Sequence, residues 1–439
     1  MPRTHLGVRF VESLLGLILL SGCRSLGTVL HDPPSTPGPL KIIVVGSGVK
    51  PLGTVQRYHR NYAQGNAMRA GVDAAAGSEQ FEEWRKDVTI EYVEDSGDPK
   101  EAEKWAQRLA LDPNVIAIIG HATSGTTRPS IPYYARARIP LLMPIATGKN
   151  VMLGHHSGAS PIRYSNCLRL PPCDVPYQAA AIMLAAQKLL GVSGKTALLR
   201  KRICLLVDHT EESKEYSIPL ETELRRFLQP NITVPVTLYP TNTIDPIRTA
   251  AAEDPDLLIF CGYAETARSL LRQIPETFPA DKCPVVLLTD GCFSSHLITT
   301  SGLVAYVTFP SPDIRTLEAC PDHPALQGAL AEPDRPSTLF SYEMFGYDAL
   351  LLLEHAFSKC VKERQPISRD NVLRQLRSLT DYSGSCRLLY AFDAFGENRH
   401  PRYYLYKCID SSDGLTVVLD AEYEAEELAA IANTEGTAP

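Results

Sequence analysis

Residues 115–147 hold two apolar runs, and each run ends in a turn of small, mostly polar residues. The first run, 115–119, stops at a glycine, and a short amphipathic helix is expected over 129–138. The second run, 139–143, ends in Pro-Ile-Ala-Thr. Nearly continuous apolar strands joined by a helix predict a βαβ unit of a parallel sheet. Ligands bind beyond the carboxyl ends of such strands, where helix N–H groups also attract anions, so this unit predicts a pocket for a small charged molecule.

The same alternation of strands and helices continues on both sides of this unit. Strands are expected at 41–45, 88–93, 203–207, 234–239, 257–261, 285–288 and 304–308, and helices at 63–75, 175–190, 212–227, 265–274, 340–359 and 369–379. Asp98, Asp174 and Asp245 stand where helix N-caps or helix starts are expected. A chain of 439 residues suits two domains better than one core. The predicted fold class is therefore α/β, with two doubly wound parallel-sheet lobes.

The lobes are expected to be discontinuous in sequence, because the chain leaves the first lobe near Asp174 and returns near Phe309. The expected boundaries are 40–174 and 310–380 for the first lobe, and 175–309 and 381–420 for the second.

Two segments near the C-terminal end predict local structure of their own. Residues 388–392 and 403–407 flank an Asp-Ala-Phe-Gly turn and predict a hairpin. The acidic, alanine-rich residues 421–439 predict a disordered tail or a frayed helix.

The N-terminal residues 1–22 have the features of a processing segment, with a basic start and a short apolar core. The core ends in Leu-Ser-Gly-Cys, which resembles the bacterial lipobox, so Cys23 is expected to be lipidated and to become the mature N-terminus. Residues 23–39 are proline-rich and predict an extended tether. The expected location is the cell envelope, anchored to a membrane on its periplasmic or extracellular face; the alternative is a soluble protein with an apolar start.

Composition and motifs argue against several function classes. The net charge of −7 excludes nucleic acid as the main partner, because phosphate binding needs a basic face. No apolar stretch reaches the roughly 18 residues of a membrane span. The sequence contains no Walker lysine motif, no G-x-S-x-G and no H-E-x-x-H. We therefore expect a binding protein with no catalytic residues, no metal and no cofactor.

The cysteines fit an oxidising compartment. The chain has 11 cysteines, and setting Cys23 aside leaves an even number that is compatible with disulfides. Cys204 and Cys261 lie inside apolar strands and are expected to be buried free thiols. Cys167 and Cys173 could pair across a loop.

A series of short motifs runs in order through residues 41–407. Its residues are Asp98-Pro99, Ala102, Ile118-Ile119-Gly120, Ser124, Ile139-Pro140, Ala146-Thr147, Arg169, Asp174, Gln178, Gly262-Tyr263, Gly346-Tyr347-Asp348-Ala349, Phe392-Asp393 and Gly396. Together they resemble the type I periplasmic binding protein family, in particular the branched-chain amino acid receptors of ABC transporters. The resemblance implies two lobes joined by a three-crossing hinge that closes on the ligand.

The resemblance also implies which residues of the first lobe hold the ligand. Ser124, together with backbone N–H groups of its loop, would bind the carboxylate of an amino acid. Ile145 and Thr147 would bind the ammonium through a carbonyl and a hydroxyl. This division is chemically sensible, because a zwitterion needs donors at one end and acceptors at the other.

The second lobe would complete the site. Asp290 occupies the position of an acidic residue that binds the ammonium, and Tyr216 and Tyr263 match tyrosines that close over the ligand. Lys50, Arg57, His59 and Arg60 stand where the family usually has a more neutral turn. Lys50 and the two arginines favour a ligand with a polar or acidic side chain over an aliphatic one.

Each of these residues also has an ordinary structural interpretation. Ser124 could cap a helix, Ile145 and Thr147 could be turn residues, Asp290 could form an Asx-turn, and Tyr263 could pack between helices.

Three functions remain open at this point. The first is a lipid-anchored receptor that delivers a small amino-acid-like ligand to an ABC permease. The second is a sensor of the same fold without transport. The third is an enzyme on this scaffold, because a fold does not fix a function.

Overall fold

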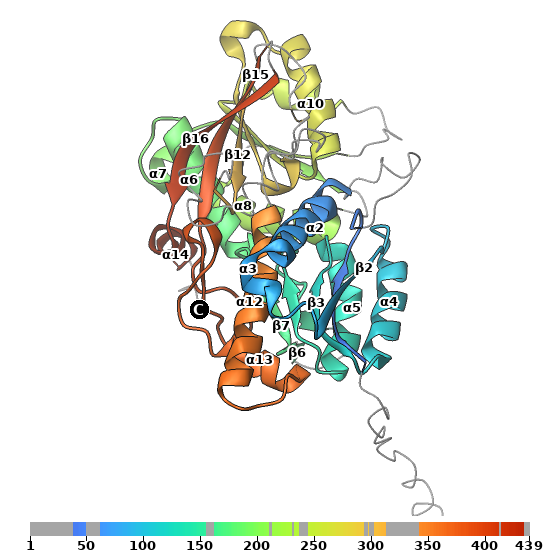
Figure 1. The fold of residues 1–439 in the computed structure, drawn as a ribbon. Coiled ribbons are helices and arrows are strands. Elements are labelled where there is room, and N and C mark those ends of the chain that lie inside the picture. Colours follow the sequence, from blue (N-terminus) through green and yellow to red (C-terminus); the bar gives the residue numbers. More distant parts are fainter. Residues whose placement is uncertain are drawn as a thin grey trace, which may run out of the picture. The chain divides into compact units, whose positions relative to one another are not determined.

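The computed structural model describes residues 38–49, 62–154, 162–209, 213–230, 232–236, 245–293, 297, 303–312, 342–411 and 414–433. The described elements form two large sheets, each covered by helices on both faces, and two short two-stranded sheets (Figure 1).

The first sheet is parallel throughout and has the strand order β2-β1-β3-β4-β7. Its strands are β1 (Leu40–Val45), β2 (Val88–Val93), β3 (Val115–Gly120), β4 (Leu141–Met143) and β7 (Cys167–Arg169).

Successive side chains of β1 serve opposite faces of this sheet, as the pleat requires. Ile42 and Val44 pack with helices α2 (Tyr62–Gly77) and α12 (Tyr342–Lys362). Ile43 and Val45 pack with α4 (Pro99–Leu111) and α5 (Ser124–Arg136) on the other face. Burial on both faces explains why these strands are continuous apolar runs.

The second sheet is mixed and has the strand order β16-β15-β12-β11-β10-β8-β9. Its parallel strands are β8 (Ile203–Asp208), β9 (Ile232–Val236), β10 (Leu257–Cys261), β11 (Val285–Leu288) and β12 (Val304–Phe309). The antiparallel strands β15 (Tyr403–Ser411) and β16 (Gly414–Tyr423) extend it at one edge. The expectation of a purely parallel second sheet therefore needs this correction.

Helices cover both faces of the second sheet. One face carries α6 (Ala179–Leu189) and α8 (Lys214–Leu228), and the other carries α9 (Pro246–Ala251) and α10 (Ala264–Thr277).

The chain passes three times between the two sheets. It leaves the first sheet after β7 for β8, returns from β12 to α12, and leaves again after β14 (Leu389–Tyr390) for β15. α13 (Arg369–Arg377) and the residues around β14 pack with the first core before the third passage.

Helices α2 and α12 lie side by side in the first lobe and approach each other very closely (Figure 1). A Cβ atom on Gly346 would lie 2.3 Å from the carbonyl oxygen of Met68, and one on Gly71 would lie 1.8 Å from that of Glu343. Only glycine fits at these two positions, because any side chain would overlap the facing backbone.

Two expected helix starts are confirmed by their caps. The Asp98 carboxylate accepts a hydrogen bond from the Lys100 N–H, and Asp245 accepts from the N–H groups of Ile247 and Arg248. Asp174 instead begins a π-helical turn, Asp174–Gln178, that leads into α6.

The expected hairpin of residues 388–392 with residues 403–407 was wrong. β14 pairs with β13 (Tyr382–Ser383), whereas β15 forms its hairpin with β16. Leu388 and Tyr390 lie in the first core, although residues 381–400 were assigned to the second lobe.

Residues 421–439, expected to form a disordered tail or a frayed helix, contain the end of β16 and helix α14 (Ala425–Asn433). Tyr423 and Leu428 are buried in the second core, so apolar residues spaced among the acidic ones anchor this segment.

The described cysteines are mostly free thiols. Cys204 and Cys261 are buried and free, as expected, and Cys386 is disulfide-bonded. Cys167 and Cys173 are both free and buried, so the expected pairing of these two was wrong.

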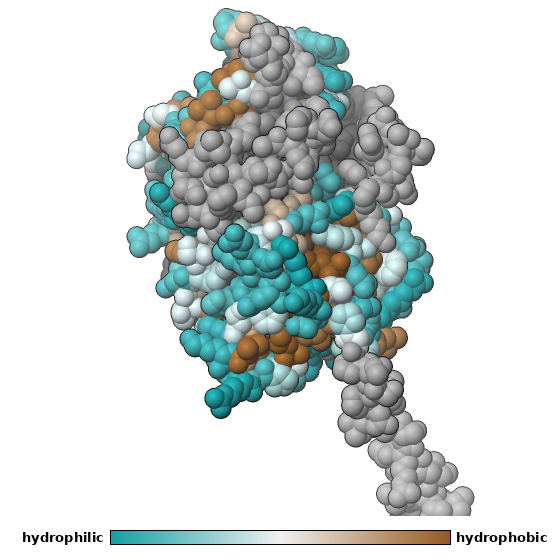
Figure 2. All heavy atoms as spheres, viewed as in Figure 1, coloured by the Kyte–Doolittle hydropathy of each residue, from teal (hydrophilic) through white to brown (hydrophobic). Residues whose placement is uncertain are grey.

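The surface of the described residues is mainly hydrophilic on the side shown in Figure 2, with hydrophobic residues in separate small patches. Among the described helices, none is long and apolar enough to cross a membrane. Residues 1–37, which include Cys23 and most of the expected tether, lie outside the described residues.

Candidate functional site

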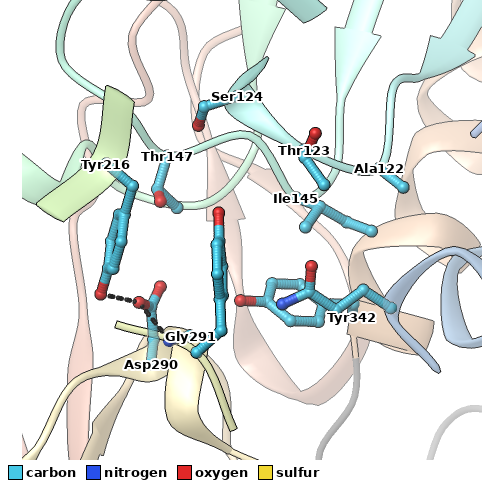
Figure 3. A pocket seen from close by; sticks show the side chains of 11 residues that line it. Ala122, Thr123, Ser124, Ile145, Thr147, Tyr216, Asp290, Gly291 and Tyr342 are labelled. Atoms are coloured by element: carbon cyan, nitrogen blue, oxygen red, sulfur yellow. Dashed lines mark hydrogen bonds between the residues drawn. The ribbon is translucent and has the colours of Figure 1, made fainter. Parts of the chain in front are cut away.

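A small cavity lies where loops of the two lobes face each other. Its described lining consists of Gln64, Ala122, Thr123, Ser124, Ile145, Thr147, Tyr216, Tyr263, Asp290, Gly291 and Tyr342. All six residues proposed from the sequence are in this set. Figure 3 shows Ser124 and Thr147 on one side and Asp290 with Gly291 on the other.

The first loop ends β3 and begins α5. Thr123 caps this helix, with its hydroxyl oxygen accepting a hydrogen bond from the Thr126 N–H at 3.2 Å. α5 therefore begins at Ser124, five residues before the expected start, because the hydroxyl residues form the cap and first turn instead of a separate loop. The first N–H groups of a helix lack intrahelical partners, and Thr123 and Ser124 at this end of α5 line the cavity.

The hydroxyl of Ser124 has a defined direction. Its oxygen accepts a hydrogen bond from the Gly148 N–H at 3.1 Å, so its own proton remains available to a ligand. Ser124 is thus arranged as a donor beside the positive end of a helix, which suits a carboxylate.

The second loop follows β4 and contributes Ile145 and Thr147, both buried. The carbonyl oxygen of Thr147 accepts hydrogen bonds from the Asp174 N–H at 3.0 Å and from the Arg169 guanidinium. These bonds fix the loop backbone and leave the Thr147 side chain at the cavity.

Asp290 lies two residues beyond the end of β11, at the start of the short helical turn Asp290–Cys292, and is 2% exposed. Its Oδ1 accepts hydrogen bonds from the Tyr216 hydroxyl at 2.6 Å and from the Gly291 N–H at 2.7 Å (Figure 3). Its Oδ2 is buried and has no hydrogen-bond partner among the described residues. Since an unsatisfied buried carboxylate oxygen is costly, this atom calls for a donor from outside the chain.

Burial raises the pKa of Asp290 above its usual value, and the neighbouring Tyr216 hydroxyl, Gln178 side chain and Gly291 N–H oppose that rise. Burial likewise raises the pKa of the nearby Asp174 to about 8, against the opposing effect of Arg169. The Tyr216 pKa is raised well above its usual value by burial and by Asp290, so the phenol stays protonated and donates. A cation bound at Asp290 would lower the pKa of both carboxyl groups.

Aromatic residues form the walls of the cavity. The rings of Tyr216 and Tyr263 stack with their centroids 5.8 Å apart and their planes at 20°. Tyr342, the first residue of α12, supplies a third ring and is 6% exposed.

The comparisons with known proteins follow this geometry. The family model of periplasmic binding proteins matches residues 61–413. This chain belongs to the periplasmic binding protein family. The family comprises binding proteins, which are not enzymes, and it indicates an extracytoplasmic location. None of the curated proteins is significantly similar to this solute-binding protein.

Solved structures show the type I periplasmic binding protein fold, which confirms the predicted fold class. A leucine-binding protein of Thermotoga maritima has a TM-score of 0.65 and 18% identity, with 88% of this chain and 99% of that chain covered. A branched-chain amino acid transporter substrate-binding protein of Streptococcus pneumoniae, solved with isoleucine, has a TM-score of 0.63 and 17% identity, with 87% of this chain and 100% of that chain covered. A solute-binding protein of Rhodopseudomonas palustris, solved with 3,4-dihydroxybenzoic acid, has a TM-score of 0.64 and 13% identity, with 88% of this chain and 98% of that chain covered.

Five lining residues were missed in the sequence: Gln64, Ala122, Thr123, Gly291 and Tyr342. Thr123 and Gly291 adjoin proposed residues and Ala122 lies two positions before Ser124, so the positions of Ser124 and Asp290 could have indicated them. No sequence signal marks Gln64 or Tyr342, which reach the cavity from helices α2 and α12.

Other expectations concern charge and metals. Lys50, Arg57, His59 and Arg60 lie outside the described residues, and Asp290 is the only charged residue in the described lining. Within the described part of the chain, no group of three or more His, Cys, Asp or Glu residues could hold a metal ion.

Proposed function

We propose that this solute-binding protein captures a small zwitterionic ligand of the amino acid type between its lobes and delivers it to an ABC permease. The observation that carries the proposal is the Oδ2 atom of Asp290, buried at the cavity without a partner among the described residues. A ligand ammonium would satisfy this atom with a charge-assisted hydrogen bond.

The opposite side of the cavity suits the other end of a zwitterion. Ser124 offers its hydroxyl proton, and the first turn of α5 offers N–H groups. Ile145 and Thr147 would add acceptors for the ammonium from the first lobe. Tyr216 and Tyr263 would cover the ligand from the second lobe.

Two classes of ligand are represented among the solved relatives, namely aliphatic amino acids and hydroxylated benzoic acids. A hydroxybenzoate could donate a phenol hydrogen bond to Asp290, but it would bring no positive charge to neutralise the buried carboxylate and would add a second carboxylate to the cavity. We therefore favour an amino acid. We further propose that the ligand has a polar or acidic side chain. This part of the proposal depends only on the positive charges of Lys50, Arg57 and Arg60.

Capture requires closure of the two lobes around the three connections. We propose that the hinge lies near Asp174, Phe309 and the segment between β14 and β15, because residues 379–385, where the sequence placed the third crossing, come before β14 and adjoin the first core. A ligand that contacts Ser124 in one lobe and Asp290 in the other would favour the closed state, because both contacts form together only there. Cys23 would anchor the protein to the membrane through its lipid.

A thermal-shift screen tests the ligand class. The standard L-amino acids are compared with 4-hydroxybenzoate and 3,4-dihydroxybenzoate, each at millimolar concentration. We expect at least one amino acid to raise the melting temperature and the benzoates to have no effect. Stabilisation by a benzoate alone would reject the amino acid proposal.

A further inference from the structure

Arg169 is a fully buried cation that bonds to the second ligand loop and does not line the cavity itself. It is the last residue of β7, next to the first passage between the sheets. Its Nη1 donates to the carbonyl oxygen of Thr147, and its Nη2 donates to that of Gly148 at 2.9 Å. One guanidinium thus holds two consecutive carbonyl groups of this loop, which a single-point ammonium could not match.

The effect of Arg169 reaches the cavity through these two loop residues. Thr147 contributes its side chain to the lining. Gly148 donates its N–H to Ser124 Oγ at 3.1 Å and so leaves the Ser124 proton free for a ligand. If the loop shifted, Thr147 would move and Ser124 would lose the bond that orients it. Both hydroxyl groups of the proposed ligand site therefore depend on one buried side chain.

The same residue is bonded to the third passage between the sheets. The Arg169 N–H donates to the Gly396 carbonyl at 2.9 Å, and Arg169 Nε lies 3.4 Å from Glu397 Oε2. Residues 393–397 form a tight turn in the segment that leads from β14 to β15. Arg169 therefore connects the ligand loop with a segment that must move or twist when lobes close.

We infer that Arg169 is a positioning residue for the ligand: it orients Thr147 and Ser124 and ties their loop to the third interlobe connection. The inference rests on the proposed function for its ligand, whereas its statement about the loop holds independently of any ligand.

Arg369 provides a matched control. Its guanidinium also bonds backbone carbonyl groups, those of Val115 at 2.7 Å and Ala137 at 3.0 Å, with Asp112 as a third acceptor. Val115 begins β3, whereas the cavity lies beyond the other end of that strand. Arg369→Lys should therefore perturb the first lobe without reaching the ligand loop.

The experiment compares Arg169→Lys, Arg369→Lys and the unchanged protein by hydrogen–deuterium exchange. Two amides report on the loop, those of Gly148, bonded to Ser124, and Asp174, bonded to Thr147. We expect about tenfold or faster exchange at both amides in Arg169→Lys, because bonds from a charged donor are lost there. Arg369→Lys should leave both rates unchanged.

Thermal stabilisation by an equimolar mixture of the standard L-amino acids is then measured for each protein. We expect the shift to disappear in Arg169→Lys and to persist in Arg369→Lys. Unchanged exchange at the two amides, a retained shift in Arg169→Lys, or equal effects of both variants would overturn the inference. Faster exchange with no shift even in the unchanged protein would instead reject the proposed function and leave the loop assignment standing.

A second variant protects the test against misfolding of Arg169→Lys. Glu397→Gln removes only the carboxylate charge beside Arg169 Nε, and its side chain is 21% exposed. We expect the same two amides to exchange faster, by about threefold, since one charged contact is weakened. No change in this variant would contradict the link to the third connection.

Discussion

Replacing Asp290 with asparagine should separate ligand affinity from stability. Asparagine has nearly the same shape, and its amide oxygen can keep the contacts from Tyr216 and the Gly291 N–H. The substitution removes the negative charge at the buried Oδ2 atom, where we place the ligand ammonium.

The magnitude follows from the burial of this carboxylate. Asp290 is 2% exposed, so a ligand ammonium left facing a neutral amide would be an unpaired buried charge. Breaking such a pair costs about 3–5 kcal/mol, which corresponds to a loss in affinity between roughly 100-fold and a few thousand-fold. The ligand-free protein should keep or slightly raise its melting temperature, because a buried charge without a cation has been removed.

Isothermal titration calorimetry with the amino acid found in the screen measures the affinity, and thermal unfolding without ligand measures the stability. Asp208→Asn is the matched control. Asp208 is a second buried carboxylate, at the end of β8, where it accepts a hydrogen bond from Thr266 Oγ1, and it does not line the cavity. Its substitution should leave affinity unchanged. An affinity of Asp290→Asn within threefold of the unchanged protein would refute the reasoning.

Three further predictions concern single sites. Gly148→Ala should weaken ligand binding about tenfold in calorimetry, because its Cβ would lie 2.8 Å from Ser124 Oγ. Gly125→Ala is the control: its Cβ would meet no atom nearer than 3.9 Å, so this variant should bind the ligand normally. The free energy of unfolding, measured with urea, should fall as pH rises from about 5 to 8, by up to about 1.4 kcal/mol per pH unit. The reason is that burial raises the pKa of Asp174 to about 8 in the folded protein, whereas the usual value is 3.8. In Asp174→Asn the free energy of unfolding should depend less on pH. Gly346→Ala should lower the free energy of unfolding in urea by about 1–3 kcal/mol, because its Cβ would lie 2.3 Å from the carbonyl oxygen of Met68 in α2. An unchanged free energy of unfolding would contradict the close packing of α2 and α12.

The sequence predicts an element best when the burial of that element directly sets its pattern of apolar residues. Residues 257–261 and 285–288 were predicted as strands with their observed bounds, because both lie inside the second sheet and are apolar along their length. The caps Asp98 and Asp245 were equally clear, since each precedes a proline at the first helical position.

The misplaced elements share a physical cause, which is that tertiary contacts decided between local alternatives. Threonine and serine favour turns and caps alike, and only packing makes Ser124 the start of α5. Acidic composition suggested disorder after residue 420, yet Leu428 is fully buried against the second core. Strand β16 carries Val418 and Leu419 about half exposed, so its apolar pattern does not reveal a buried face.

The lining residues of the cavity were predictable where they lie just beyond the carboxyl ends of strands. Ser124, Thr147 and Asp290 follow strands of parallel sheets, so their positions follow from topology. Gln64 and Tyr342 reach the cavity from helices whose position depends on glycine-mediated packing between α2 and α12, and local sequence does not specify that packing.

A crystal structure with the amino acid found in the screen tests the central claim most directly. We predict one ligand in the cavity, with its nitrogen about 2.7–3.2 Å from Asp290 Oδ2 and its carboxylate facing Ser124 Oγ and the first turn of α5. A ligand carboxylate beside Asp290, or an amino acid bound outside this cavity, would contradict the account.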